Sequence, residues 1–183
     1  MIERLSFINI PYEFIKAVDH KDLEVIPYHM NTKNQYACLL SHIKALEAFK
    51  ASGDSIGIII EDDIVFTKDF KEKLDITLTQ LPEEWWMFYL GFLPKEGRTE
   101  FKEGIYQMRS EEGAFGYIVK KELVDFLLNV HKELREPSDV NMTRFHGNRV
   151  YGIMPLMVMV EADYSDIQEE EVEWESIEQY FKE

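Results

Sequence analysis

The fold is indicated by the stretch Ser55-Ile56-Gly57-Ile58-Ile59-Ile60, which runs directly into the three carboxylates Glu61-Asp62-Asp63. The β-branched run is typical of a strand that is buried on both faces of a sheet. Apolar residues recur with helical spacing on either side of it, over residues 35–51 and over residues 70–81. An apolar strand between two helices predicts an α/β domain, with the carboxylates at the carboxyl end of the strand.

Strands and helices alternate along the rest of the chain as well. We expect further strands over residues 14–18, 85–90, 113–119 and 150–160, the last interrupted at Pro155. A further helix is predicted where Leu123, Leu127, Val130 and Leu134 align on one face. This order predicts a mostly parallel sheet flanked by helices.

Three residues are expected to mark helix ends. Gly53 follows the helix over residues 35–51 and is a typical stop signal. Thr67 is the expected N-cap of the helix over residues 70–81, and Pro82 closes that helix.

Composition narrows the class of protein. The chain has 183 residues, 45% apolar and 30% charged, which is typical of one soluble globular domain. A net charge of -15 argues against a nucleic-acid binder, which needs a basic face. Apolar runs are far shorter than the roughly 20 residues of a membrane span, and the start lacks the pattern of a signal peptide. The single cysteine, Cys38, excludes an internal disulfide and a cysteine-based zinc site, so we expect a cytoplasmic protein.

The C-terminal segment differs in charge from the rest. Residues 161–183 contain ten acidic residues and one lysine. We therefore divide the chain into a domain over residues 1–167 and an acidic tail over residues 168–183. Trp174, Ile177, Tyr180 and Phe181 have near-helical spacing, which favours an amphipathic helix that docks on the domain or on a second copy in a homo-oligomer. A disordered tail is the competing interpretation.

The acid triplet Glu61-Asp62-Asp63 has two interpretations. Three adjacent carboxylates repel one another, and a hard divalent cation such as Mn²⁺ or Mg²⁺ would stabilise them. Acidic residues are also common in solvated turns. Spacing alone does not choose between a metal site and a charged turn.

The residues around the triplet resemble a known family. Cys38, Ser41 and His42 lie on a predicted helix that precedes the strand ending in Glu61-Asp62-Asp63. This arrangement is similar to glycosyltransferase family 25, whose pattern is a Gly-Cys-x-x-Ser-His helix followed by a strand ending in Glu-Asp-Asp. Ala37 stands where the family usually has glycine.

Further segments match the family in the same order. They are Phe14 to Asp19, Leu90-Gly91, Gly113 to Val119, Pro137-Ser138-Asp139 and Tyr164 to Ile167. The resemblance thus extends from about residue 4 to residue 167. It implies a GT-A-like (Rossmann-like) fold and a metal-dependent transfer of a sugar, commonly galactose from UDP-galactose, to a saccharide or glycoconjugate acceptor with inversion.

The resemblance also implies roles for individual residues. Asp63 and Asp62 are the expected metal ligands, and Glu61 and Asp62 would contact the sugar nucleotide. Asp139 is the expected catalytic base on the acceptor side. The other substrate-binding candidates are Ser41, His42 and Asp166.

Each of these candidates has a structural alternative. Asp139 is equally well explained as a helix N-cap, and Asp166 suits a turn. The hydroxyl of Ser41 can bond the helix backbone. A lone helical histidine such as His42 is usually structural, and Cys38 is expected to be a small buried apolar residue. His42 is nevertheless expected to face the strand end, where it would bond a phosphate or an acid of the triplet.

One element of the family pattern is not recognisable. Family members begin with a strand and an arginine-rich pattern, whereas this sequence starts in what we expect to be the following helix. The alternative function is therefore a non-catalytic relative that binds a glycan or a partner protein.

Overall fold

The computed structural model describes residues 2–28, 30–94, 98–108, 112–134, 136–143, 149–160, 164–165 and 170–171. The helices are α1 (Ile2–Ile8), the 3-10 helix η1 (His20–Asp22), α2 (Lys33–Ser52), α3 (Phe70–Gln80), α4 (Lys121–Leu134) and α5 (Ser138–Thr143). The strands are β1 (Ile56–Ile60), β2 (Ile64–Phe66), β3 (Met87–Leu93), β4 (Thr99–Lys102), β5 (Ile105–Gln107), β6 (Glu112–Lys120), β7 (Val150–Ile153), β8 (Val158–Val160), β9 (Tyr164–Ser165) and β10 (Glu170–Glu171).

The central sheet has six strands in the order β1-β6-β3-β7-β5-β4. The prediction of a mostly parallel sheet is wrong, because only β3 and β7 pair in parallel and the other four pairs are antiparallel. Strands β1, β3, β7 and β4 share one direction, and β6 and β5 run the opposite way. Strand β6 lies between β1 and β3, and β5 lies between β7 and β4. Apolar runs such as that of β6 show that both faces of a strand are covered, and they say nothing of its direction.

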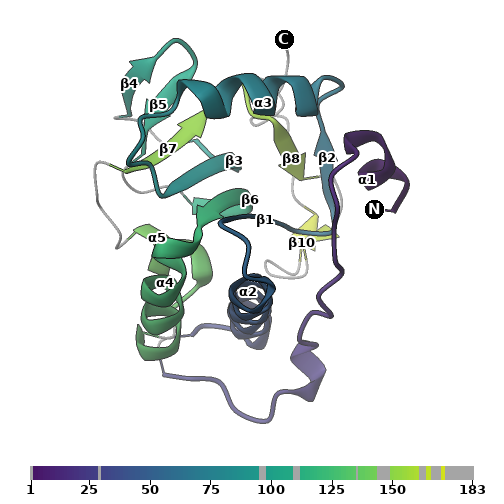
Figure 1. The fold of residues 1–183 in the computed structure, drawn as a ribbon. Helices are drawn as coiled ribbons and strands as arrows, with labels where there is room; N and C mark the ends of the chain where they lie inside the picture. Colours follow the sequence, from purple (N-terminus) through teal and green to yellow (C-terminus); the bar gives the residue numbers. More distant parts are fainter. Residues whose placement is uncertain are drawn as a thin grey trace.

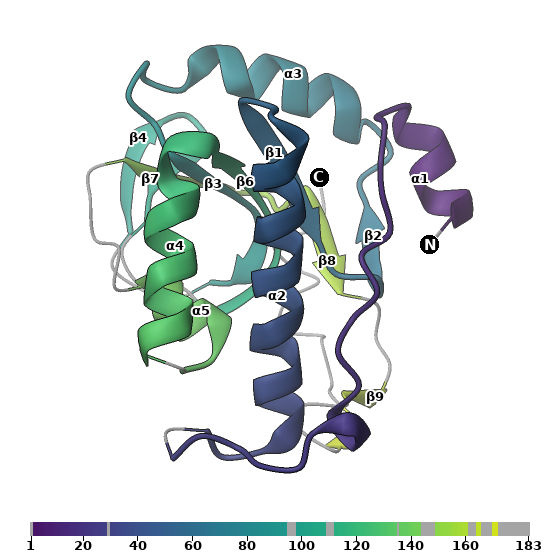
Figure 2. The same cartoon turned by 60° about the horizontal axis from the view of Figure 1, so that its bottom comes forward.

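Helices cover both faces of this sheet (Figures 1 and 2). On one side α2, α4 and α5 pack on one buried cluster, which includes Met87 and Tyr89 of β3. On the other side α1, α3 and the small β2–β8 sheet pack on a second cluster, which includes Phe88 and Leu90. Successive residues of β3 therefore point to opposite apolar layers, as expected for a strand buried on both faces.

Helix α2 is the element that lies along β1. Its first turn is capped by Thr32, whose hydroxyl oxygen accepts from the N–H of Gln35 at 3.2 Å. Gly53 ends the helix with a φ of 80°, which confirms the predicted stop. A Cβ on Gly57 of β1 would lie 2.6 Å from the ring of Phe49, so the absence of a side chain there lets the helix approach the strand closely.

Two local predictions are wrong. Residues 14–18 are extended but pair with no strand of the described chain; Ser41 instead fixes the segment to α2 by accepting from the N–H of Val18 at 2.9 Å. Thr67 is not the N-cap of α3, because the helix begins later, at Phe70, with Asp69 at the capping position. The carbonyl of Thr67 accepts from the N–H of Phe70 at 3.1 Å and closes a turn before the helix.

The remaining strand predictions are confirmed near their expected positions. The segment over residues 150–160 splits into β7 and β8 around a cis Met154–Pro155 bond. The hairpin β4–β5 is not among the strands that the sequence predicts. Within the described residues, no helix is long and apolar enough to cross a membrane.

Candidate functional site

The candidate site lies at one end of the central sheet. Because β1 and β6 are antiparallel, the carboxyl end of β1 pairs with Gly116 in the middle of β6, and the amino end of β6 extends beyond it. The N–H of Glu61, the first residue after β1, donates to the carbonyl of Phe115 at 2.9 Å. The N–H of Gly113, two residues earlier on β6, donates to Oδ2 of Asp139 at 2.9 Å. The two carboxylate-bearing segments are therefore joined to neighbouring positions of one strand.

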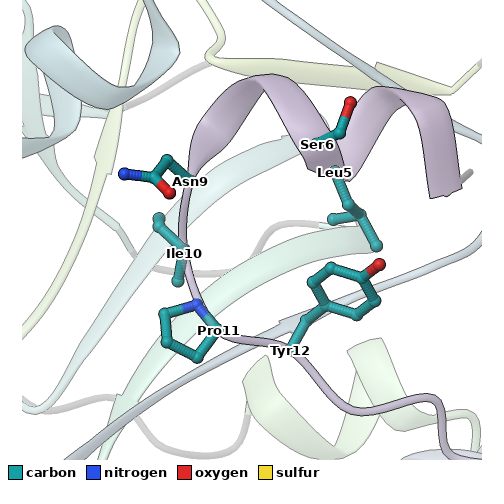
Figure 3. A pocket seen from close by; sticks show the side chains of 6 residues that line it. All are labelled: Leu5, Ser6, Asn9, Ile10, Pro11 and Tyr12. Atoms are coloured by element: carbon teal, nitrogen blue, oxygen red, sulfur yellow. The ribbon is translucent and has the colours of Figure 1, made fainter.

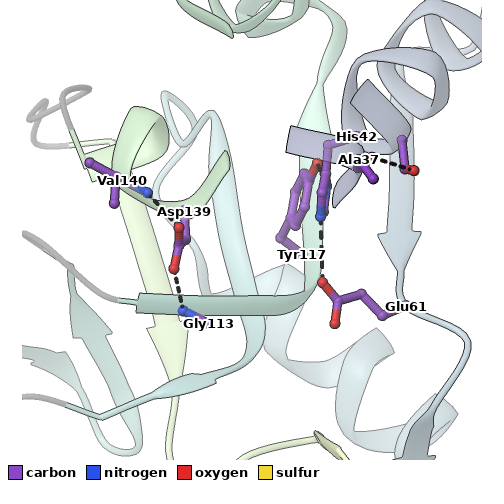
Figure 4. Close-up of polar contacts among 8 residues, drawn as sticks. Ala37, His42, Glu61, Gly113, Tyr117, Asp139 and Val140 are labelled. Carbon is purple, nitrogen blue, oxygen red and sulfur yellow. Dashed lines mark hydrogen bonds and ion pairs between the residues drawn. The ribbon is translucent and has the colours of Figure 1, made fainter. Parts of the chain in front are cut away.

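His42 connects helix α2 to this strand end (Figure 4). Its Nε2 lies 3.5 Å from Oε1 of Glu61, and its Nδ1 lies 3.1 Å from the hydroxyl of Tyr117 on β6. A carboxylate only accepts hydrogen bonds, so Nε2 carries a proton in this geometry; Nδ1 accepts from Tyr117 in the neutral imidazole and donates to its hydroxyl oxygen in the imidazolium. The predicted contact between His42 and an acid of the triplet is thus present.

Burial and charge act in opposite directions on His42. The side chain is 6% exposed, and burial disfavours its protonated form. Tyr117, Cys38 and Glu61 act against burial, and the pKa of His42 is raised well above its ordinary value. We attribute the direction mainly to the carboxylate of Glu61, which is 33% exposed and favours an imidazolium beside it. The pKa of Tyr117 is raised by its own burial.

Cys38 completes a group of three ligand-type side chains. It lies one helical turn before His42, on the same face of α2. The thiol of Cys38, the imidazole of His42 and the carboxylate of Glu61 offer ligand atoms that all lie within 4.8 Å of one another. Among the residues that the structure describes, these three are the one group of at least three His, Cys, Asp or Glu side chains placed closely enough to hold a metal ion.

Asp62 and Asp63 occupy the turn between β1 and β2, and each residue leaves part of its surface exposed. Partial burial raises the pKa of Asp63 to about 6, and the charges of Glu61 and Asp62 add to this effect. Arg4 on α1 opposes the shift, and its Nη1 donates to the carbonyl of Ile64 at 2.7 Å. The turn is therefore a place of excess negative charge. Glu61, however, points toward His42, and the three acids do not converge as one cluster among the described residues.

Ser41 is held by two backbone groups. Its hydroxyl donates to the carbonyl of Ala37 at 2.8 Å and accepts from the N–H of Val18 at 2.9 Å. The bond to Ala37 is the helix-internal contact that the sequence allowed as an alternative. A substrate contact of Ser41 stays a prediction.

Asp139 is the second residue of α5 rather than its N-cap. Its Oδ2 accepts from Gly113, and its Oδ1 accepts from the N–H of Val140 at 2.8 Å (Figure 4). The carboxylate thus ties α5 to the amino end of β6 and is oriented there. Its catalytic role stays a prediction.

Other sequence candidates lie elsewhere. Asp166 falls outside the described residues, as does the tail apart from Glu170–Glu171. Trp85 is 6% exposed and belongs to the buried cluster beneath α1 and α3, and Nζ of Lys120 lies 4.7 Å from the centre of its ring. A surface hollow beside α1 is lined by Leu5, Ser6, Asn9, Ile10, Pro11 and Tyr12 (Figure 3). Its lining comes from one short segment without acidic side chains.

Sequence reasoning missed two members of the site. Cys38 was expected only to fill space, although its spacing of four residues from His42 was a visible signal. Tyr117 sits in an apolar strand and has no local signal, because only the fold brings its hydroxyl to His42.

The structure is that of an α/β protein whose candidate site lies at the end of β1, where Glu61, Asp62 and Asp63 follow the strand. The family model of glycosyltransferase family 25 (LPS biosynthesis protein) matches residues 1–142. The chain therefore belongs to glycosyltransferase family 25, and its mixed sheet flanked by helices is consistent with a Rossmann-like glycosyltransferase fold. No curated protein sequence matches the chain significantly.

Proposed function

We propose that this protein is a metal-dependent glycosyltransferase that moves a sugar, with galactose as first candidate, from a UDP-sugar to a saccharide or glycoconjugate acceptor. Membership of the family supports sugar transfer between a donor and an acceptor. One observation carries the more specific proposal. The acid turn after β1 and the oriented carboxylate of Asp139 are joined to positions two residues apart on β6, about 7 Å along the strand.

Asp62 and Asp63 are the proposed ligands of a Mn²⁺ or Mg²⁺ ion. Carboxylate oxygens are the ligands that these hard cations prefer. Burial is the largest cause of the raised pKa of Asp63, and the charges of Glu61 and Asp62 add to it, so a cation bound at this turn would stabilise the ionised carboxylate. The ion would supply charge neutralisation for the diphosphate of the donor. This arrangement is the basis for proposing a GT-A-like active site.

Asp139 is the proposed base for the acceptor. Its carboxylate would take the proton of the acceptor hydroxyl as the hydroxyl oxygen bonds to the anomeric carbon and the bond to UDP breaks. Attack opposite the leaving group inverts the anomeric centre. The hydrogen bonds from Gly113 and Val140 orient the carboxylate and leave lone pairs on both oxygens. Ser41 and His42 are held by protein partners, and their predicted substrate contacts carry no step of this proposal.

The test is a thermal shift with a matched control. We expect Mn²⁺ plus UDP to raise the melting temperature of the wild-type protein and to leave Asp63→Ala unshifted. Asp54→Ala is the control, because Asp54 is an exposed acid at the opposite end of β1 and should keep the shift. Transfer assays with UDP-galactose and other UDP-sugars then identify the donor.

A second outcome would favour the non-catalytic alternative. If no nucleotide diphosphate shifts the wild-type melting temperature with either metal, the proposed donor site is wrong. Binding of glycans without any nucleotide requirement would then indicate a family member that recognises saccharides without transferring them.

A further inference from the structure

A group of metal-ligand side chains beside the acid turn has no part in the proposed transfer reaction. We propose that Cys38, His42 and Glu61 form a separate site for a borderline-soft divalent cation such as Zn²⁺. The ligands would be Sγ of Cys38, Nε2 of His42 and a carboxylate oxygen of Glu61. One candidate ligand atom from each of the three side chains already lies within 4.8 Å of the other two.

The distances suit a small cation. Zinc bonds to nitrogen and oxygen measure about 2.0–2.2 Å, which places two such ligands roughly 3.4 Å apart in a tetrahedral site. Nε2 of His42 and Oε1 of Glu61 lie 3.5 Å apart. Cys38 lies one turn before His42 on α2, so both side chains emerge on one face of the helix.

The close approach of α2 and β1 brings the ligands together. Two of them come from the helix and one from the end of the strand. Gly57 permits the approach, because any side chain there would meet the ring of Phe49. The site is thus built by the tertiary packing and not by one loop.

The orientation of the imidazole also suits a metal ligand. A ligating histidine usually gives its second ring nitrogen to a hydrogen-bond partner, which fixes the ring. Nδ1 of His42 has such a partner in the hydroxyl of Tyr117 at 3.1 Å. With a cation on Nε2, Nδ1 carries the proton and donates it to Tyr117.

Charge and access favour binding as well. A thiolate and a carboxylate together carry two negative charges, which a divalent cation balances in a partly buried position. His42 is buried, whereas Cys38 is partly exposed and Glu61 is 33% exposed, so the cation can enter from solvent. Three protein ligands leave a fourth position open, as in zinc sites that bind a water or a substrate.

The ligand set distinguishes this site from the acid turn. Sulfur and imidazole nitrogen favour Zn²⁺ and Co²⁺, whereas Mn²⁺ and Mg²⁺ prefer oxygen ligands such as those of Asp62 and Asp63. The two sites are therefore separable by the metal that each one takes, and failure of one leaves the other untouched.

The experiment uses Co²⁺ as a spectroscopic probe for the full chain after treatment with a chelator. Because Cys38 is the single cysteine, any sulfur-to-cobalt charge-transfer band in the near ultraviolet must come from this residue. We expect one cobalt per chain, a charge-transfer band, and visible bands of tetrahedral intensity. Zn²⁺ should remove these bands by displacement, and an equal concentration of Mn²⁺ should not.

Variants test each of the three ligands. Cys38→Ala should abolish the charge-transfer band, and Glu61→Gln and His42→Gln should each weaken cobalt binding about ten-fold or more. His20→Gln, at an exposed histidine on η1, should leave both band and affinity unchanged. Circular dichroism melting curves verify that each variant is folded. Glu61 is partly exposed, so its variant keeps the test usable if His42→Gln does not fold.

Two results would overturn the proposal. One is a folded wild-type protein that shows no sulfur-to-cobalt band with excess cobalt. The other is a sulfur-to-cobalt band together with a cobalt affinity that is unchanged in Glu61→Gln and in any folded His42 variant. This result would indicate that cobalt binds to the thiol alone.

Discussion

The N–H of Gly113 donates a hydrogen bond of 2.9 Å to Oδ2 of Asp139, and this contact joins helix α5 to the amino end of β6. The same carboxylate is the proposed base for the acceptor. A structural role and a chemical role therefore rest on one side chain. The two roles make different demands, because the hydrogen bond needs an acceptor oxygen whereas the chemistry needs a group that takes a proton.

Two substitutions of Asp139 separate these roles. Asp139→Asn keeps an oxygen for Gly113, loses the acceptor for Val140 and removes the base, so we expect a loss of stability of at most about 1 kcal/mol and a loss of transfer activity of about 100-fold or more. Asp139→Ala removes the acceptor as well and should also lower the free energy of unfolding by about 1–3 kcal/mol. Urea unfolding and kcat measurements provide the two readouts.

Asp125→Asn is the control for this pair. Asp125 is exposed on α4, where it pairs with Lys50, and its substitution should change neither activity nor stability by more than about 0.5 kcal/mol. Full activity in Asp139→Asn would show that Asp139 is structural only, and the base would have to be sought elsewhere.

The contact between Gly57 and Phe49 gives a second prediction. A Cβ at Gly57 would lie 2.6 Å from the Cδ2 atom of Phe49, closer than such atoms normally approach. We expect Gly57→Ala to lower the free energy of unfolding by about 1–3 kcal/mol through overpacking. Gly57→Ala should also weaken cobalt binding at Cys38, because it pushes α2 away from β1.

A double substitution checks the cause. Phe49→Leu removes ring atoms and should recover part of the loss when combined with Gly57→Ala, so the two effects are not additive. Strictly additive losses would mean that the ring and the added methyl group do not meet.

The regular elements of this fold could be predicted from local patterns, and the sheet topology could not. Helix α2 and strand β1 appear in the sequence because apolar spacing and a β-branched run report burial directly. Strand direction has no corresponding local pattern. The sequence therefore predicts a mostly parallel sheet, although β6 runs antiparallel to both of its neighbours. The strand predicted over residues 14–18 is absent, because a strand also needs a partner to pair with and local pattern does not supply one.

The candidate site divides in the same way. The acid turn is visible as three consecutive residues, and the predicted contact of His42 with it is present at Glu61. The convergence of Cys38 with Glu61 depends on how closely α2 lies on β1, which is set by Gly57 and Phe49. The distance between α2 and β1 cannot be predicted from a local sequence pattern.

Ser41 gives a third prediction. Its hydroxyl is the acceptor for the N–H of Val18 and so holds the extended N-terminal segment on α2. Ser41→Ala should lower the free energy of unfolding by about 1 kcal/mol and increase proteolytic cleavage within residues 10–19. Ser52→Ala, at an exposed hydroxyl at the end of the same helix, is the matched control and should not affect cleavage there. Equal cleavage of Ser41→Ala and the wild type would show that other contacts hold the segment.

His131 on α4 is fully buried, and neither of its ring nitrogens has a hydrogen-bond partner among the described residues. A polar group that is buried without a partner costs stability, whereas an apolar side chain of similar size does not. We expect His131→Leu to raise the free energy of unfolding at neutral pH by about 1–3 kcal/mol. His20→Leu, at an exposed position, should change it by less than about 0.5 kcal/mol. A destabilised His131→Leu would indicate that the imidazole has a polar partner in solution.

The same residue predicts how stability depends on pH. Burial lowers the pKa of His131 to about 3 in the folded protein, and the nearby His42 adds to this effect, whereas an unfolded chain has the ordinary value of 6.5. Between these values the unfolded state binds a proton that the folded state does not, so this histidine destabilises the fold increasingly as pH falls below 6.5. One such proton corresponds to about 1.4 kcal/mol per pH unit.

The difference in unfolding free energy between His131→Leu and the wild type should therefore be constant above about pH 7 and widen from about pH 6.5 downward. Urea unfolding of both proteins over this range measures that difference, in which the titrations shared by the two proteins cancel. Parallel curves would show that His131 is protonated as readily in the fold as in the unfolded chain.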